Sequence, residues 1–210
     1  DKVVIKTNYI LANPNTPNSI SEHKVDFVVE VESVGDSSKI ASGAIRDTKN
    51  PRDILLAQQA AKVIINSGYF KDGFSIQTGS GGASLAAVKF IRESMIEKGI
   101  KANYALGGIT AHMVKMHEEG LIKRLIDVQS FDKVAAESVK DNEFHKEVSA
   151  SEYAAADEQG SATHYLDIVI LSALEVDVDF NVNVLVGSDG IIRGAIGGHP
   201  DTAADSALSI

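Results

Sequence analysis

Cysteine is absent from this 210-residue chain, and tryptophan is absent as well. Without cysteine the chain has no disulfide framework and no thiolate metal site, and its composition suits a reducing compartment such as the cytoplasm. The six histidines are scattered, and the run "HMVKMHEEG" lacks the H-E-x-x-H order that places two imidazoles on one helical face. We therefore expect no metal ion.

Positive charge and long apolar runs are also scarce. The chain has 20 Lys and Arg against 29 Asp and Glu, which gives a formal net charge of −9. Nucleic-acid binding requires a basic stripe, and a membrane-spanning helix requires roughly 20 apolar residues in a row. The sequence offers neither, so we expect no nucleic acid and no membrane as partner. An anionic ligand must then be held locally, by peptide N–H groups and a few placed cations.

The length allows one large domain or two small ones. The stretch "NYILANPNTPNS" sets prolines among asparagines and predicts an N-terminal arm or loop over residues 1–24. We expect a single α/β domain over residues 25–210, in which "KVDFVVEVESV" alternates as a strand with one buried face. The chain starts at "DKVV", without an initiator methionine, and stops within an apolar segment, so we expect it to be a piece of a longer protein.

Strand and helix patterns alternate along the rest of the chain. A helix is predicted from Asn50 and Pro51 to Gly68, and "GFSIQT", "ANYALGG", "LIDVQSFD" and "LDIVILSALEV" are typical of strands. Asp189 and Gly190 form a hairpin-type turn near the C-terminus. The order predicts an open, mostly parallel sheet flanked by helices on both faces, with an antiparallel hairpin added near its end.

Glycines gather at three expected strand-to-helix junctions, "TGSGGAS", "LGGITAH" and "IGGHPDT". Such junctions lie at the carboxyl ends of the strands, where free peptide N–H groups meet the positive end of a helix. Glycine at 79, 81 and 82 permits a positive φ and removes the Cβ, so a phosphate, carboxylate or thioester oxygen can approach. The same geometry can form an oxyanion hole.

For any one junction, a tight turn with close helix–sheet packing is the favoured explanation, because the conformational freedom of glycine accounts for it alone. The presence of three such junctions shifts the balance toward a ligand without deciding between the two explanations. The sequence contains no G-x-x-x-x-G-K-[ST] loop, and Ser84 stands where a G-x-G-x-x-G pattern needs its last glycine. Dinucleotide binding is therefore poorly supported.

Several long strings identify a family resemblance. "DGFSIQTGSGGASLA", "LGGITAHMVKMHEEGL", "LIDVQSFD" and "LEVDVDFNVNVLVGSDGIIRGAIGGHPDTA" closely resemble the citrate lyase alpha subunit family, from about Val25 to the end of the chain. The resemblance places the chain in the carboxyl-terminal half of that longer subunit. It implies a CoA-transferase-type α/β fold, shared with sugar-phosphate isomerases, in which the active site lies between two similar halves.

The resemblance also implies a reaction and partners. In this family citrate displaces acetate from an acetyl thioester on an acyl carrier protein, the gamma subunit, whose arm is phosphoribosyl-dephospho-CoA. A separate lyase, the beta subunit, then cleaves the citryl thioester. A cytoplasmic multi-subunit complex that handles a CoA-type thioester and no metal is therefore implied. Alternatives are a half-domain that binds CoA or an acyl thioester without activity of its own, another CoA-transferase or acetyl-CoA hydrolase, and, more remotely, a sugar-phosphate isomerase.

The glycine-rich junctions, and motifs shared with CoA-transferases in general, together nominate the site residues. "GAIGGHPDTA" is similar to a glycine-glycine-x-x-aspartate loop that approaches CoA, and "LEVDVDFNVNV" is similar to a motif ending in asparagine-valine-asparagine. The residues nominated as catalytic are Gly107, Gly108 and Glu175, and those nominated for substrate and thioester binding are Thr78, Gly79, Ser80, Gly81, Gly82, Arg193, Gly197, Gly198, His199 and Asp201.

One position departs from the wider superfamily. Where many relatives carry the glutamate that takes the acyl group, this chain has Thr110, Ala111 and His112. A covalent route needs a carboxylate nucleophile, so direct attack by a citrate carboxylate is the consistent mechanism. Glu175 and Glu118 remain as carboxylates near the inferred site.

The nominated polar residues each have a simpler explanation. Glu175 is either a costly carboxylate in an apolar strand or a strand-end residue that faces solvent. Arg193 and His199 either pair with citrate carboxylates or are solvated. Asp201 follows Pro200 and suits the first turn of a helix as well as a ligand. Asp189 is expected to have a structural role, which is to stabilise the Asp-Gly turn.

Overall fold

The computed structural model describes residues 1–13, 18–36, 48–155 and 160–210. Its centre is a six-stranded sheet in the order β10-β7-β3-β4-β5-β6, in which every neighbouring pair is parallel. The strands are β3 (Ser75–Thr78), β4 (Tyr104–Ile109), β5 (Leu125–Ser130), β6 (His145–Glu147), β7 (Ile168–Ile170) and β10 (Leu208–Ser209). The predicted open parallel sheet is confirmed.

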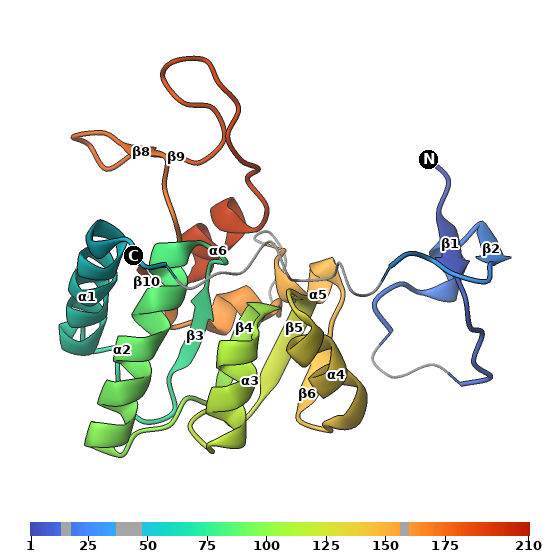
Figure 1. Cartoon of the computed structure of the whole chain (residues 1–210), viewed down its shortest axis with the longest axis horizontal. Helices are drawn as coiled ribbons and strands as arrows, with labels where there is room; N and C mark the ends of the chain where they lie inside the picture. Colours follow the sequence, from blue (N-terminus) through green and yellow to red (C-terminus); the bar gives the residue numbers. More distant parts are fainter. Residues whose placement is uncertain (14–17, 37–47, 156–159) are drawn as a thin grey trace.

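Helices cover both faces of this sheet (Figure 1). One face carries α1 (Pro51–Asn66), α2 (Gly82–Lys98), α3 (Ala111–Glu118) and α4 (Lys133–Asp141), and the other carries α5 (Ala150–Tyr153), the 3-10 helix η3 (Ala162–Tyr165) and α6 (His199–Asp205). Local chemistry sets the ends as predicted: the Asn50 side chain accepts from the Arg52 N–H at 3.0 Å, and Gly99 ends α2 with φ 65°.

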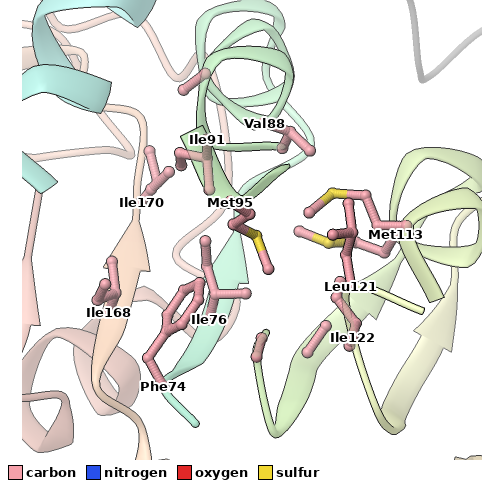
Figure 2. Packing of buried hydrophobic residues seen from close by; sticks show 14 of the residues in the cluster. Phe74, Ile76, Val88, Ile91, Met95, Met113, Leu121, Ile122, Ile168 and Ile170 are labelled. Atoms are coloured by element: carbon pink, nitrogen blue, oxygen red, sulfur yellow. The ribbon is translucent and has the colours of Figure 1, made fainter. Parts of the chain in front are cut away.

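The larger core lies under α1 to α4. Figure 2 shows Phe74 and Ile76 from the β3 side meeting Ile91 and Met95 of α2. Burial of apolar surface is the largest favourable contribution to the free energy of folding. A smaller cluster on the opposite face contains Tyr153. Among the described residues, no helix is long and apolar enough to cross a bilayer.

The path of the chain creates a switch point between β3 and β7. From β3 the chain steps outward through β4 and β5 to β6, and then returns by α5 and η3 to β7, on the other side of β3. In open α/β sheets, ligands bind in the crevice outside the carboxyl ends of the strands at such a point. The first glycine-rich junction, directly after β3, lies there.

The N-terminal segment differs from the prediction. It contains β1 (Val4–Thr7), the 3-10 helix η1 (Glu22–Lys24) and β2 (Phe27–Glu30), and β1 and β2 form a separate two-stranded parallel sheet. The predicted strand therefore exists, but it pairs with the expected arm and not with the central sheet. Its predicted buried face is wrong, because all four β2 residues are exposed. Within the described residues, nothing covers this apolar strand.

A projecting arm joins β7 to α6, over residues 171–198 (Figure 1). It contains the antiparallel hairpin of β8 (Glu175–Val176) and β9 (Val182–Asn183), so the predicted antiparallel element is confirmed. The predicted Asp189–Gly190 turn is also present, closed by a single bridge between Val186 and Ile192. At the tip of the β8–β9 hairpin, Phe180 has φ 63° and the residue is 84% exposed.

Candidate functional site

The bend over residues 78–82 is fixed at the switch point by bonds to β7 and the segment after it. The Gly79 N–H donates to the Ile170 carbonyl at 2.8 Å, and the Ser84 and Ser172 hydroxyls lie 3.1 Å apart. The Thr78 side chain is buried, whereas Ser80 is exposed. The bend is thus bonded to the sheet on one side and exposed to solvent at Ser80. It lies at the place where open α/β sheets bind ligands.

The start of α2, just beyond this bend, is uncapped. Gly81 is the N-cap residue, no side chain caps it, and no acidic residue stands in the first turn. A 17-residue helix leaves its first N–H groups without intrahelical partners, and they carry a partial positive charge. Among the described residues, no protein acceptor meets the N–H groups of Ser80, Gly81 or Gly82. This arrangement fits an anionic oxygen.

The reason for the three glycines differs from the prediction. None of Gly79, Gly81 and Gly82 has a positive φ, so backbone conformation does not require them. A Cβ on Gly81 would lie 2.6 Å from the Ser172 hydroxyl, and one on Gly82 would lie 3.1 Å from Thr48 Cβ. A Cβ on Gly79 would make only ordinary contacts, at 3.4 Å or more. Close packing explains the two later glycines and leaves Gly79 unexplained by the chain itself.

At the second junction, a carboxylate of the protein itself meets the start of the helix. Gly107 and Gly108 lie inside β4, at a register shift against β5, and not at the predicted strand-to-helix junction. The N-terminus of α3 is already filled, because the Asp132 carboxylate accepts from the Ala111 N–H at 2.6 Å and also caps α4 through the Ala135 N–H at 2.9 Å. The protein's own carboxylate occupies the place expected for a ligand oxygen.

Neighbouring side chains explain the two strand glycines. A Cβ on Gly108 would overlap the Phe131 ring, and one on Gly107, whose φ is 98°, would lie 2.7 Å from the Gln77 carboxamide carbon. Their packing role is therefore clear, and their nomination as catalytic stays a prediction.

Replacing Gly108 with alanine is expected to lower the free energy of unfolding by about 1–3 kcal/mol, the usual cost of overpacking. Urea unfolding of the variant measures it. In a Phe131→Leu background, which leaves room for the new methyl group, the same replacement should cost much less. An equal loss in both backgrounds would show that the Phe131 ring is not the cause.

The third junction brings four nominated residues together at the start of α6. Gly197 has φ 49°, and Gly198 is the N-cap residue, packed against Tyr153. His199 Nδ1 donates to the Ile196 carbonyl at 2.8 Å, which leaves Nε2 as the acceptor in the neutral ring. Nε2 is buried and has no partner among the described residues. Asp201 lies in the first turn of α6, which agrees with the prediction that it suits a helix start as well as a ligand.

Glu175 and Arg193 lie on the arm. Glu175 is exposed and is not the buried strand carboxylate considered from the sequence. It accepts from the Ser188 hydroxyl and from the Ser188 N–H at 2.8 Å, and these bonds hold the pKa of Glu175 below its usual value. Arg193 pairs with Asp189 at 2.5 Å, which raises the pKa of Arg193. Arg193 is thus engaged with Asp189, where the sequence suggested a citrate carboxylate.

Two hollows lie elsewhere. One of about 1060 Å³ separates residues 18–23 from α4 and β6, and one of about 430 Å³ lies between α2 and α3 beside Thr48. None of the nominated residues lines either of them. In the described ranges, no cluster of three or more histidine or acidic side chains is arranged to hold a metal.

The sequence did not reveal the residues that connect the glycine-rich junctions to one another and to the helices. Asp132 precedes a helix pattern and was recognisable as an N-cap. Gln77 and Tyr153 meet across the sheet, with Gln77 Nε2 donating to the Tyr153 hydroxyl at 2.7 Å. No local pattern marked Tyr153, because its contacts are 76 residues away in the chain.

Comparisons with known proteins agree on one family. The family model described as citrate lyase, alpha subunit (CitF) matches residues 1–210. The chain is 58% identical to the citrate lyase alpha chain of Haemophilus influenzae and 56% identical to that of Escherichia coli, in each case over 100% of this chain. It spans only 42% and 41% of those two relatives.

Solved structures give the same result for the fold. The crystal structure of the putative alpha subunit of citrate lyase from Streptococcus mutans, in complex with citrate, matches all of this chain and 41% of its own, with 54% identity and a TM-score of 0.89. A Pseudomonas malonate decarboxylase hetero-tetramer, in complex with malonate, matches 96% of this chain and 37% of its own, at 18% identity and a TM-score of 0.59. At that identity the second likeness shows the fold alone.

Proposed function

Because the chain belongs to the citrate lyase alpha subunit family, we propose that it is part of a citrate CoA-transferase, the component of citrate lyase that exchanges acetyl for citryl on a carrier-protein thioester. The observation that carries this proposal is the bend over residues 78–82, whose uncapped helix start lies at the switch point of the sheet. The citrate-bound relative from Streptococcus mutans supports citrate as the second substrate. The carrier and lyase subunits are the partners that the proposal requires.

The substrates suit the chemistry of the bend. Citrate and the phosphate-bearing thioester arm are both anions, and the net charge of −9 leaves local N–H groups to hold them. We propose that N–H groups of Ser80, Gly81 and Gly82 receive either an anionic group of the arm or the oxygen that becomes negative when the thioester carbonyl is attacked. The Gly197–Asp201 loop, at the same edge of the sheet, would hold another part of the arm.

The proposed reaction is direct transfer. A citrate carboxylate oxygen adds to the acetyl carbonyl and the carrier thiolate leaves, which gives a mixed anhydride of citrate and acetate. The thiolate then attacks the citryl carbonyl of this anhydride, the citryl thioester forms, and acetate departs. The protein contributes orientation and stabilisation of negative charge, which are large effects without a covalent intermediate.

A covalent glutamyl intermediate is disfavoured by the carboxylates available. Residues 110–112 contain none, and Glu175 is exposed and held by Ser188. Hydroxylamine or borohydride added to the full-length subunit with acetyl-CoA should therefore trap no glutamyl adduct. A trapped adduct on Glu175 would establish the covalent route in its place.

Isotope exchange tests the proposed activity. The full-length subunit should move labelled acetate into acetyl-CoA, or into its dephospho analogue, only when citrate is present. Exchange without citrate would favour a different CoA-transferase, and simple release of acetate would favour a hydrolase. The absence of any thioester chemistry would remove the proposal.

A binding half-domain is the second candidate. It is favoured by the exposure of Glu175 and Arg193, which leaves these two nominated residues of the arm on an open surface. Isothermal calorimetry of the 210-residue chain with CoA distinguishes the two functions, together with the exchange assay. Measurable binding by this chain, without turnover by the full-length subunit, would favour the half-domain.

A further inference from the structure

Two buried polar side chains connect the first and third glycine-rich junctions. Gln77 directly precedes the bend over residues 78–82, and Tyr153 ends α5. The Gln77 side-chain amide donates to the Tyr153 hydroxyl at 2.7 Å, and the two residues are only 7% and 8% exposed. The bond joins β3 to α5, on the face of the sheet that carries the smaller core cluster.

Both side chains press closely on glycines that the sequence nominated. A Cβ on Gly198 would lie 2.7 Å from the Tyr153 hydroxyl, so the loop that starts α6 rests directly on this oxygen. A Cβ on Gly107 would lie 2.7 Å from the Gln77 carboxamide. The pKa of Tyr153 is raised, first by burial and also by the negative charge of Asp201.

Packing alone does not account for the pair. Gln77 Oε1 is buried and has no hydrogen-bond partner among the described residues. Leaving a buried polar atom unpaired costs free energy, and an apolar side chain of similar size would avoid that cost. The polar pair has one evident geometric effect, which is to fix the Gly197–Gly198 loop relative to the bend after β3.

We propose that Gln77 and Tyr153 are positioning residues, which set the separation between the bend over residues 78–82 and the loop over residues 197–201 so that both contact one anionic thioester substrate. The inference rests on the proposed function. Neither side chain needs to touch the substrate, because each acts through the main chain that it supports.

Tyr153→Phe in the full-length subunit tests this role, because it removes one oxygen and keeps the ring. The matched control is Tyr104→Phe on the same face of the sheet, whose hydroxyl donates to the Tyr165 carbonyl at 2.7 Å and touches neither glycine loop. We expect Tyr153→Phe to raise the KM for the acetyl thioester about tenfold, with the KM for citrate unchanged. The control should leave both constants within about twofold.

Hydrogen–deuterium exchange provides a readout that does not depend on activity. Peptides covering residues 194–202 should exchange faster in Tyr153→Phe than in Tyr104→Phe. Equal exchange in the two variants, or equal changes in both KM values, would overturn the inference. If the wild-type subunit shows no thioester exchange, the proposed function fails, and the deuterium result still decides whether Tyr153 holds the loop.

Discussion

Replacing Gly79 with alanine in the full-length subunit is expected to reduce thioester exchange about 100-fold while leaving stability nearly unchanged. The new Cβ would make only ordinary contacts within the chain, the nearest at 3.4 Å from the Ser84 hydroxyl, and Gly79 has no positive φ. The protein itself therefore tolerates the methyl group. The methyl group would, however, displace a substrate oxygen that must reach the neighbouring N–H groups. A displacement of about 1 Å at a reacting centre costs on the order of 100-fold in rate.

Gly35→Ala is the matched control for this variant. Gly35 also has no positive φ, and a Cβ there meets no atom within 4 Å. Exchange activity should be unchanged in this control, and the thermal midpoints of both variants should stay close to that of the wild type. If Gly79→Ala keeps full activity, the bend does not receive the substrate closely, and close packing then explains Gly81 and Gly82 without any ligand.

Asp127→Ala is expected to have the largest effect on stability, a loss of about 3–5 kcal/mol in the free energy of unfolding. Asp127 is fully buried in β5 and accepts from the Gln129 N–H at 2.8 Å, the Ser130 hydroxyl at 2.5 Å and His145 Nε2 at 3.2 Å. His145 is buried too, and its Nδ1 contacts the Ser138 hydroxyl at 2.9 Å. Removing the carboxylate takes the acceptor away from the buried His145 ring and from two partly buried donors, the Gln129 N–H and the Ser130 hydroxyl.

Urea unfolding of the 210-residue chain measures this loss. Asp141→Ala is the control, because Asp141 is an exposed acid at the end of α4, and its removal should change stability by no more than about 0.5 kcal/mol. A loss below about 1 kcal/mol for Asp127→Ala would mean that water reaches the donors freed between β5 and β6. The edge strand β6 would then not depend on this network.

The parts of the fold with strong local signals could be predicted from the sequence. The Asn50–Pro51 start of α1 and the Gly99 end of α2 follow from capping chemistry that acts within one helical turn. The buried strand β7 follows from its unbroken apolar run. The switch point beside the first glycine bend required the strand order, which no local pattern contains.

Long-range contacts explain where sequence reasoning failed. Gly107 and Gly108 precede a helix pattern, which predicts a junction, but the two glycines lie inside β4, packed against the Phe131 ring and the Gln77 side chain. The Asp132 carboxylate accepts a hydrogen bond from the N-terminal N–H group of α3, which is 21 residues away in the chain. The apolar alternation of β2 predicted burial, yet a strand is buried only where another layer covers it, and in the described residues none does.

The structure also separates the nominated site residues into groups. Thr78 to Gly82 and Gly197 to Asp201 are linked through Gln77 and Tyr153, whereas Glu175 and Arg193 stand on the arm with Ser188 and Asp189. The arm follows β7 directly, beside the bend. A site that uses both groups needs the arm to fold toward the bend or a further part of the protein to cover them.

A crystal structure of the full-length subunit with a non-hydrolysable acetyl-dephospho-CoA analogue would show whether the bend over residues 78–82 binds the thioester. We expect an anionic or carbonyl oxygen of the ligand within hydrogen-bond distance of the N–H groups of Ser80, Gly81 or Gly82, at the uncapped start of α2. A fully bound analogue that lies elsewhere, with only solvent at that bend, would contradict this prediction.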